Sequence, residues 1–277
     1  MAGRGPPTSP WSWTDCGHPY KRSHPLDDTP GNRFPGDQQN PGATRKKQER
    51  DMDISIIGSG SIGGTLARQL AARGHSVTIA NSRGPASLAQ LASRTGTTAA
   101  ETADAMARAQ VLILSVPMGA LPGLGPMVGS HLPDDAVVVD TSNYVPEFRD
   151  ERIPAIDGGL TESLWVARQL GRPLLKALNT VGAASLAAGG RSHGDPARIA
   201  VPVSGTDAAA KEVVTVLLDE LGFDGFDAGD LETSWRQEPG TPVYTTDLPL
   251  DRAREAVAAA VRSDTDLWRK RMAQRRP

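Results

Sequence analysis

Three glycines, Gly58, Gly60 and Gly63, follow an apolar run with the spacing G-x-G-x-x-G. Between a strand and a helix, the first glycine permits a tight turn and the second lets a pyrophosphate approach the main chain. The third lets the helix pack closely on the strand. The N–H groups at Ser61 and Ile62 would then attract phosphate, because the helix dipole lies behind them. The pattern predicts a dinucleotide-binding turn; the alternative is a glycine-rich turn without a ligand.

The residues about 20 positions further on favour one dinucleotide over the other. An NAD site usually has Asp or Glu there, against the ribose 2′-hydroxyl. This chain instead has Asn81, Ser82 and Arg83, and residues 64–100 contain no carboxylate. A guanidinium and a hydroxyl bind a 2′-phosphate by charge-assisted hydrogen bonds, and Ser59 can add a second hydroxyl. We therefore expect NADP(H); the alternative is that Arg83 is an ordinary surface arginine.

Short apolar runs alternate with helical stretches from residue 52 onward. The expected strands lie at about 54–57, 75–82, 111–117, 136–142, 173–179 and 197–205. The expected helices lie at 61–74, 85–94 and 207–222, and the segment 247–271 also has a helical pattern. Such alternation predicts right-handed βαβ units and a parallel sheet. The predicted fold class is α/β, a Rossmann-type doubly wound, mainly parallel sheet with a small C-terminal helical or α/β extension.

The first fifty residues have a different composition from the rest of the chain. They contain eight prolines and one leucine, too little apolar surface to offset the entropy of ordering them. We expect a disordered tail over 1–51, an NADP-binding domain over 52–205 and a C-terminal subdomain over 206–277 that completes the second-substrate pocket. Cys16 and His18 are too few ligands for zinc, so no metal site is expected.

Charge and hydropathy narrow the class of partner. A net charge of −2 gives no general attraction to nucleic acid or to a membrane surface. No apolar run approaches the ~20 residues that span a bilayer, and the N-terminus lacks the apolar core of a secretory signal. The single cysteine fits a reducing compartment. We expect a cytoplasmic protein that acts on a small molecule.

Several segments occur in a specific order from about residue 52 to 245. They read "IIGSGSIGGTLARQL", "NSRGP", "SVPMGALPG", "VVVDTSNY", "LLKALNTVGAASLA" and "RIAVPVSGTDAAAKEVVTVLLDELGFDGFDAGDLE". Together they resemble the NADP oxidoreductases that depend on coenzyme F420, a deazaflavin. The dinucleotide portion alone is shared with pyrroline-5-carboxylate reductase and the β-hydroxyacid dehydrogenases. The resemblance implies hydride transfer between NADP(H) and a deazaflavin or flavin-like partner. It also implies a homodimer, the usual assembly in that family.

The resemblance also assigns roles to particular residues. Ser59, Ser82 and Arg83 match the positions that bind the 2′-phosphate of NADP(H) in that family. Val116 and Pro117, preceded by Ser115, match the turn along the nicotinamide ribose. The residues expected to line the pocket of the second redox partner are Ala177, Leu178, Asn179, Val203, Ser204 and Gly205. Many relatives have an acidic pair after the glycine at 205, whereas this chain has only Asp207, and this difference bears on the identity of the partner.

Hydride transfer between two planar rings needs close placement in a slot without water, and the protein need supply no acid or base. An imine or keto-acid substrate would instead need a proton donor. Lys176 is the best candidate, with Asn179 as its companion. The β-hydroxyacid dehydrogenases have a Lys-x-x-x-Asn pair on a helix, whereas the spacing here is Lys-x-x-Asn on an expected strand. Residues i and i+3 of a strand point to opposite faces, so the two side chains would not act together. Otherwise Lys176 would be a strand-end lysine near a phosphate or solvent.

Other polar and aromatic residues have simpler interpretations. Asp140 is expected to cap the turn "DTSN", and His75 is expected to be structural. Trp235 and Tyr244 lie in a loop, where they either cover a pocket or hold the C-terminal helix against the core, and we favour the second. A further alternative is a non-catalytic protein that senses NADP(H).

Overall fold

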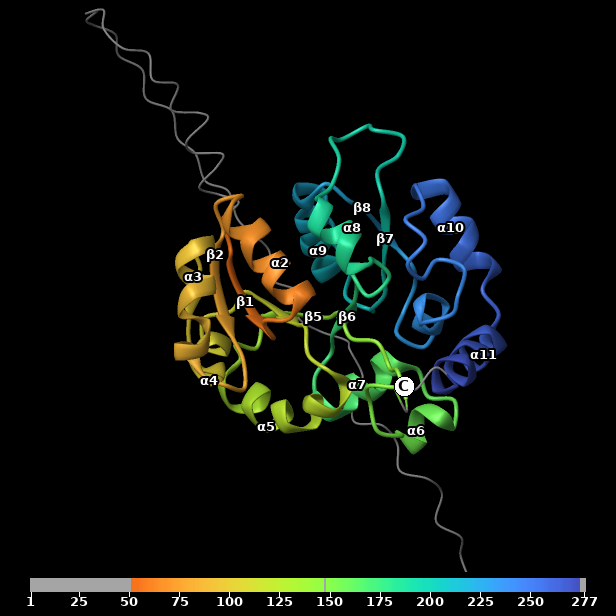
Figure 1. Ribbon diagram of the computed structural model, residues 1–277, viewed down its shortest axis with the longest axis horizontal. Coiled ribbons are helices and arrows are strands. Elements are labelled where there is room, and N and C mark those ends of the chain that lie inside the picture. The colour runs from red at the N-terminus through yellow and green to blue at the C-terminus, as the bar shows by residue number, and fades with distance from the viewer. Residues whose placement is uncertain (1–50, 147, 275–277) are drawn as a thin grey trace, which may run out of the picture. The chain divides into compact units, whose positions relative to one another are not determined.

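The computed structural model describes residues 51–146 and 148–274. Its main sheet has six strands: β1 (Asp53–Ile57), β2 (Ser76–Ala80), β3 (Thr98–Ala99), β4 (Val111–Leu114), β5 (Val137–Asp140) and β6 (Leu175–Lys176). The spatial order is β3-β2-β1-β4-β5-β6, and every neighbouring pair is parallel (Figure 1). This confirms the predicted α/β fold with a doubly wound parallel sheet. The predicted tail over 1–51, with Cys16 and His18, lies outside the described residues except for Asp51.

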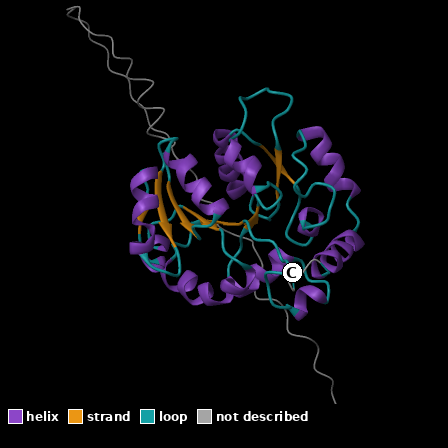
Figure 2. Cartoon of the chain, in the orientation of Figure 1, coloured by secondary structure: helices purple, strands orange, loops and turns teal. Residues whose placement is uncertain are grey.

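Helices connect and cover the strands (Figures 1 and 2). They are α2 (Ser61–Ala71), α3 (Ala89–Thr95), α4 (Thr102–Met106), α5 (Leu121–His131), α6 (Pro154–Asp157), α7 (Glu162–Leu170), α8 (Ala183–Ala188), α9 (Ala208–Leu221), α10 (Leu250–Ala259) and α11 (Arg262–Ala273). Short 3₁₀ helices occupy Pro85–Leu88, Met118–Ala120 and Ser234–Gln237. No helix within the described ranges is long and apolar enough to cross a membrane.

Alternate residues of the central strands enter two separate hydrophobic clusters. Ile54 and Ile56 of β1 belong to one cluster, together with side chains of α2 and α9. Ile57 of β1 and Leu114 of β4 belong to the other, together with side chains of α5 and α7. Because both faces of the sheet are covered, the strands read as continuous apolar runs, and this is why the sequence reveals them.

The helix α9 has capping signals at both ends. The side chain of Asp207 accepts hydrogen bonds from the N–H groups of Ala209 and Ala210 at 2.9 and 3.0 Å. At the other end, Gly222 adopts a left-handed conformation with φ of +87° and stops the helix. His75 holds α9 near the start of β1, because its ring accepts from the N–H of Met52 and lies 2.7 Å from the carboxylate of Glu220. The structural role predicted for His75 is confirmed.

The sixth expected strand, over 197–205, does not join the main sheet. β7 (Ala200–Val203) pairs in parallel with β8 (Asp224–Asp227) in a separate two-stranded sheet (Figure 2). The two sheets touch where Lys176 and Ser204 exchange main-chain hydrogen bonds of 2.8 and 3.0 Å. The expected strand over 173–179 is also shorter than predicted, since β6 contains only two residues. Its extension stops because Leu178 takes a left-handed conformation with φ of +63°.

The turn after β1 is packed without room for side chains. Gly58 has φ of +112°, and a Cβ there would lie 2.0 Å from the carbonyl oxygen of Ser115. A Cβ on Gly63 would lie 2.0 Å from the carbonyl oxygen of Gly58. The first turn of α2 therefore rests directly on the main chain of the turn, and this contact fixes where the helix begins.

This contact predicts opposite effects at two adjacent glycines. Gly63→Ala should lower the free energy of unfolding by about 1–3 kcal/mol, the usual cost of overpacking. Gly64→Ala is the matched control, because a Cβ there meets only ordinary contacts at 3.7 and 3.9 Å. It should stabilise the helix by up to about 1 kcal/mol. Urea unfolding of both variants without cofactor checks this, and equal effects at the two positions would contradict the packing argument.

Candidate active site

The turn between β1 and α2 presents free main-chain donors at the carboxyl edge of the sheet. Gly60 is the N-cap of α2 and has no side chain to satisfy the first N–H groups. A Cβ on Gly60 would meet no atom within 4 Å, so the main chain there is open to an approaching group. None of residues 61–64 is acidic, so nothing in the first turn neutralises the positive end of the helix dipole. This turn can therefore accept a phosphate group.

Asn81 joins the glycine turn to the loop after β2. Its side-chain nitrogen donates to the hydroxyl of Ser59 at 3.0 Å, and its side-chain oxygen accepts from the N–H of Arg83 at 2.9 Å. The amide of Asn81 is therefore used to position the loop. The side chains of Ser82 and Arg83 are exposed, and Arg83 forms no ion pair with any described carboxylate. The structure thus brings together Ser59, Ser82 and Arg83 of the predicted 2′-phosphate site.

A carboxylate that the sequence analysis missed faces the same loop. A Cβ placed on Gly84 would lie 3.4 Å from Oε1 of Glu101. Glu101 follows β3, the neighbour of β2, and the carboxyl ends of adjacent parallel strands meet at one edge. Glu101 directly follows the stretch 64–100, which contains no carboxylate. The adenosine end of the predicted site therefore contains one guanidinium and one carboxylate, and binding of a 2′-phosphate would depend on Arg83.

The turn after β4 packs against the glycine turn. The N–H of Ser115 donates to the carbonyl oxygen of Ile57 at 2.8 Å, and a Cβ on Gly58 would lie 3.1 Å from the side chain of Val116. Val116 is half-buried, Pro117 is exposed, and the next residue, Met118, is fully buried. The predicted nicotinamide turn is therefore apolar and adjoins the predicted phosphate site.

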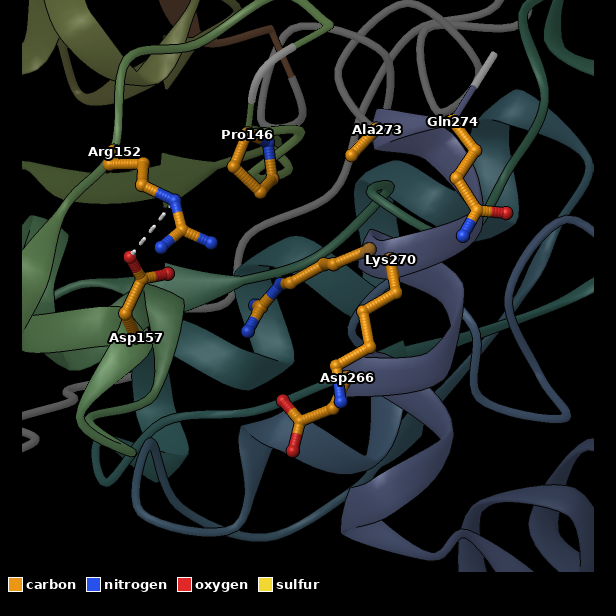
Figure 3. A pocket seen from close by; sticks show the side chains of 8 residues that line it. Pro146, Arg152, Asp157, Asp266, Lys270, Ala273 and Gln274 are labelled. Carbon is orange, nitrogen blue, oxygen red and sulfur yellow. Dashed lines mark ion pairs between the residues drawn. The ribbon is translucent and has the colours of Figure 1, made fainter.

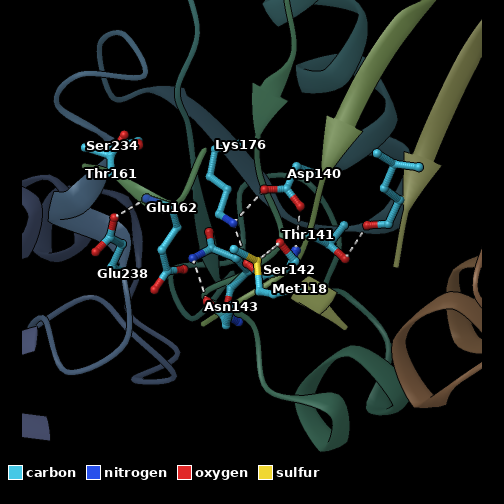
Figure 4. Close-up of polar contacts among 12 residues, drawn as sticks. Met118, Asp140, Thr141, Ser142, Asn143, Thr161, Glu162, Lys176, Ser234 and Glu238 are labelled. Carbon is cyan, nitrogen blue, oxygen red and sulfur yellow. Dashed lines mark hydrogen bonds and ion pairs between the residues drawn. The ribbon is translucent and has the colours of Figure 1, made fainter. Parts of the chain in front are cut away.

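Lys176 and Asp140 form a fully buried ion pair where β5 and β6 end (Figure 4). The Nζ of Lys176 lies 2.9 Å from Oδ2 of Asp140, and it also donates to the carbonyl oxygen of Ser142. The other carboxylate oxygen, Oδ1, accepts from the N–H of Ser142 at 2.9 Å. This confirms that Asp140 caps the turn. The expectation that a non-catalytic Lys176 would lie near solvent is wrong. Its ammonium is fully buried, and the carboxylate of Asp140 and the carbonyl oxygen of Ser142 offset the cost of removing it from water.

Asn179 is separated from Lys176 by a change in the direction of the chain. Because Leu178 is left-handed, the argument from opposite faces of a strand does not apply to residues 176 and 179. The side chain of Asn179 donates to the carbonyl oxygen of Gln237 at 2.7 Å and to Oδ1 of Asn143 at 3.1 Å. The ammonium of Lys176 instead points to Asp140 and Ser142. The two side chains do not share a hydrogen bond.

The residues predicted to line the second pocket are close together but buried. Ala177, Leu178, Asn179, Val203 and Ser204 are each at most 5% exposed, and Gly205 is also buried. Gln237 covers part of this set: its side chain donates to Oδ1 of Asn179 at 3.0 Å and accepts from the hydroxyl of Ser204 at 2.8 Å. The sequence analysis missed Gln237, since a lone glutamine in an irregular segment carries no local signal.

Trp235 and Tyr244 both contact α11. The Tyr244 and Trp268 rings are 5.9 Å apart in an edge-to-face arrangement, and the guanidinium of Arg262 lies 5.7 Å from the Trp235 ring. The preferred interpretation, that these aromatic residues hold the C-terminal helix, is confirmed.

Two buried carboxyl groups meet one arginine of α11. The Nη2 of Arg269 lies 2.8 Å from Oε1 of Glu162 and 3.3 Å from Oε2 of Glu238. Glu238 also accepts a hydrogen bond from the N–H of Glu162 at 2.9 Å, at the first turn of α7 (Figure 4). The cluster was missed because its members lie 76 and 107 residues from Glu162 in sequence.

Burial and the neighbouring carboxyl of Glu238 raise the pKa of Glu162 to about 8, and the cations Lys176 and Arg269 oppose this rise only in part. Burial likewise raises the pKa of Glu238, while the N–H of Glu162 and the guanidinium of Arg269 lower it. Near neutral pH, the carboxyl of Glu162 is therefore mainly protonated. Across residues 51–146 and 148–274, no group of three or more His, Cys, Asp or Glu side chains is arranged to hold a metal ion.

The chain is similar to several known proteins. A family model described as NADP oxidoreductase, coenzyme F420-dependent, matches residues 53–144. These residues run from β1 to just beyond β5, so they include both the glycine turn and the apolar turn after β4.

Two solved structures are similar over most of their length. SMa0349, a hypothetical protein from Sinorhizobium meliloti, is 32% identical with a TM-score of 0.58, over 75% of this chain and 96% of that one. A candidate F420-dependent NADP-reductase from Arthrobacter sp. FB24 is 30% identical with a TM-score of 0.55, over 66% of this chain and 87% of that one. The curated protein YjhV of Escherichia coli (strain K12) is 43% identical over 55 residues. This match spans 20% of the present chain and 40% of the length of YjhV.

The raised pKa of Glu162 predicts that stability falls as the pH rises. A group whose pKa is higher in the folded state stabilises the fold below its unfolded pKa, near 4.5, and loses this contribution as the pH rises through about 8. The loss approaches about 1.4 kcal/mol per pH unit between these limits. Glu162→Gln mimics the protonated carboxyl, so the free energy of unfolding of this variant should decline less between pH 5 and pH 8.

The matched control is Glu212→Gln, at an exposed position of α9, which should leave the pH profile of the parent protein unchanged. Denaturant unfolding at several pH values measures both profiles. Parallel curves for the parent and Glu162→Gln would show that Glu162 does not titrate in this range.

Proposed function

We propose that this chain, which belongs to the coenzyme F420-dependent NADP oxidoreductase family, transfers a hydride between NADP(H) and a deazaflavin or flavin-like acceptor. Membership of this family makes it an oxidoreductase of an NADP-dependent type. The choice of acceptor is our proposal. It is supported by the apolar turn at residues 115–121, which has no titratable side chain, and by the full burial of Lys176.

The observation that carries the proposal is the arrangement of the two loops at the carboxyl edge of the sheet. The uncapped N-terminus of α2 suits the pyrophosphate, because its N–H groups are free and Gly60 leaves space for close approach. Asn81 links Ser59 of the glycine turn to the loop that carries Ser82 and Arg83, and this link supports a 2′-phosphate site formed by these three side chains. The guanidinium of Arg83 would supply the positive charge that this phosphate needs.

The nicotinamide end requires orientation more than acid or base chemistry. Val116 and Pro117 would lie along the ribose and ring. The buried side chain of Met118, the next residue, accepts a hydrogen bond at its sulfur from the hydroxyl of Ser142 at 3.1 Å. NADP(H) supplies the hydride, and the chain would hold the two rings in register and exclude water. Asn179 and Ser204, which are buried and held together by Gln237, would support the pocket of the second redox partner.

An imine or keto-acid reductase would need a proton donor beside the nicotinamide. Lys176 is a poor donor in this arrangement, because its ammonium is fully buried and already donates to Asp140 and Ser142. Proton transfer from Lys176 would also leave the carboxylate of Asp140 buried without its partner. The geometry therefore favours the acceptor that needs no proton from the protein.

Arg83→Asp should weaken NADPH binding by at least tenfold, or about 1.4 kcal/mol, and leave NADH binding unchanged. The variant would place a second carboxylate beside Glu101 and repel the 2′-phosphate. Calorimetric titration of each coenzyme measures the effect. Arg94→Asp, at an exposed position of the nearby helix α3, makes the same change in net charge and should have little effect. Unchanged affinity for NADPH in Arg83→Asp would refute this placement of the 2′-phosphate.

Lys176→Met should lower the free energy of unfolding by about 3–5 kcal/mol, because it leaves Asp140 buried and unpaired. Adding Asp140→Asn should recover most of this loss. The double variant should still oxidise NADPH with the deazaflavin, within a few-fold of the parent rate. An absorbance assay at the NADPH band, with deazaflavin, flavin, cyclic imine and keto acid as acceptors, tests this.

The same assay separates the candidate functions. Turnover of an imine or keto acid that disappears in the folded double variant would support the proton-donating reductase. Tight binding of NADPH without turnover on any acceptor would support a sensor.

A further inference from the structure

A crevice of about 590 Å³ lies between α11 and the residues Pro146, Arg152 and Asp157 (Figure 3). Its lining residues are Pro146, Arg152, Asp157, Asp266, Arg269, Lys270, Ala273 and Gln274. Asp266, Arg269, Lys270 and Ala273 of α11 recur at intervals of three, four and seven residues, so they share one face of that helix, and Gln274 is its C-cap. The volume falls within the range of small-molecule sites, roughly 300–1,000 Å³, and exceeds what a single inorganic ion fills. None of the lining residues belongs to the predicted dinucleotide site.

Cationic groups predominate among the side chains that line this crevice. Arg152, Arg269 and Lys270 are positive, and Asp157 and Asp266 are negative. The carboxylate of Asp157 already has partners, because it accepts from the hydroxyl of Tyr144 at 3.3 Å and lies 3.9 Å from Nε of Arg152. Asp266 is thus the one lining carboxylate without an ion pair to a described residue.

Two of the cations retain unused donors. Arg269 is fixed through Nη2 by Glu162 and Glu238, and its guanidinium lies 5.0 Å from the Tyr144 ring. Its Nη1 makes no hydrogen bond to any residue in the described ranges. The ammonium of Lys270, one position along α11, likewise forms no ion pair with a described carboxylate. Arg269 is thus held rigidly at the crevice with a free donor, and Lys270 adds a second cation beside it.

We propose that this crevice binds a small organic anion, whose carboxylate or phosphate group is held by Arg269 and Lys270. Pro146 and Ala273 would contact the apolar part of the ligand, and the amide of Gln274 can donate a further hydrogen bond. Asp266 can accept from a hydroxyl or amino group of the same ligand. A metal ion is a poor alternative, because no cluster of three ligating side chains occurs among the described residues.

The inference does not depend on the hydride-transfer proposal, because no residue is shared between the two sites. Binding should therefore occur without NADP(H). It should also strengthen the attachment of α11, since the anion would contact the same arginine that joins the helix to Glu162 and Glu238.

The test is calorimetric titration of the full-length chain with sodium succinate and, separately, with inorganic phosphate. Sodium chloride at matched ionic strength is the reference for general screening. The proposal expects a Kd of about 1 mM or tighter for at least one of the two anions. Binding of succinate alone would identify a carboxylate ligand, and binding of phosphate alone would identify a phosphate ester.

Variants on α11 separate a specific site from surface charge. Lys270→Gln should weaken binding at least fivefold, and it leaves the buried contacts of Arg269 intact. Arg271→Gln is the matched control, because Arg271 is the next residue on α11 and does not line the crevice. Saturating NADPH should change the affinity less than twofold. No heat beyond the chloride reference, equal weakening by the two variants, or loss of binding with NADPH would each overturn the proposal.

Discussion

The close contact of three main-chain segments at the carboxyl edge of the sheet determines where everything else in the predicted dinucleotide site can lie. The end of β1, the first turn of α2 and the end of β4 meet at distances that exclude a Cβ at Gly58 and at Gly63. The same contact leaves Gly60 facing open space. The first N–H groups of α2 are therefore both fixed in position and free of partners. The packing that excludes side chains at Gly58 and Gly63 therefore also prepares the turn to bind an anion.

A second set of constraints holds the C-terminal part of the described chain against the main sheet. Lys176 and Asp140 join the ends of β5 and β6 through a fully buried ion pair. Arg269 joins α11 to Glu162 of α7 and to Glu238. Gln237 connects Asn179 with Ser204, which exchanges main-chain hydrogen bonds with Lys176. Because removal of one partner leaves the other buried and unsatisfied, these contacts specify one arrangement of the segments more than they add to stability.

The sequence predicts those elements that are defined by residues close together in the chain, and it does not predict those that depend on distant residues. The central strands and α9 are evident because local patterns define them: apolar residues covered on both faces, and the caps Asp207 and Gly222. β3 and β8 were missed because neither has a distinct apolar run, and 197–205 gave no sign that its strand would leave the main sheet. Glu162, Glu238 and Arg269 were not identified, because ordinary charged residues become significant only when folding buries them together. Glu101 was missed for a related reason, since it reaches the loop after β2 from the neighbouring strand.

The outer strands of the main sheet, β3 and β6, each contain only two residues. Short border strands offer few unpaired N–H and C=O groups to another polypeptide. On the β6 side, the exchange between Lys176 and Ser204 occupies the main chain of the border itself. Neither border can thus recruit an additional strand over any useful length. Accidental edge-to-edge aggregation through the main sheet is therefore disfavoured at both of its borders.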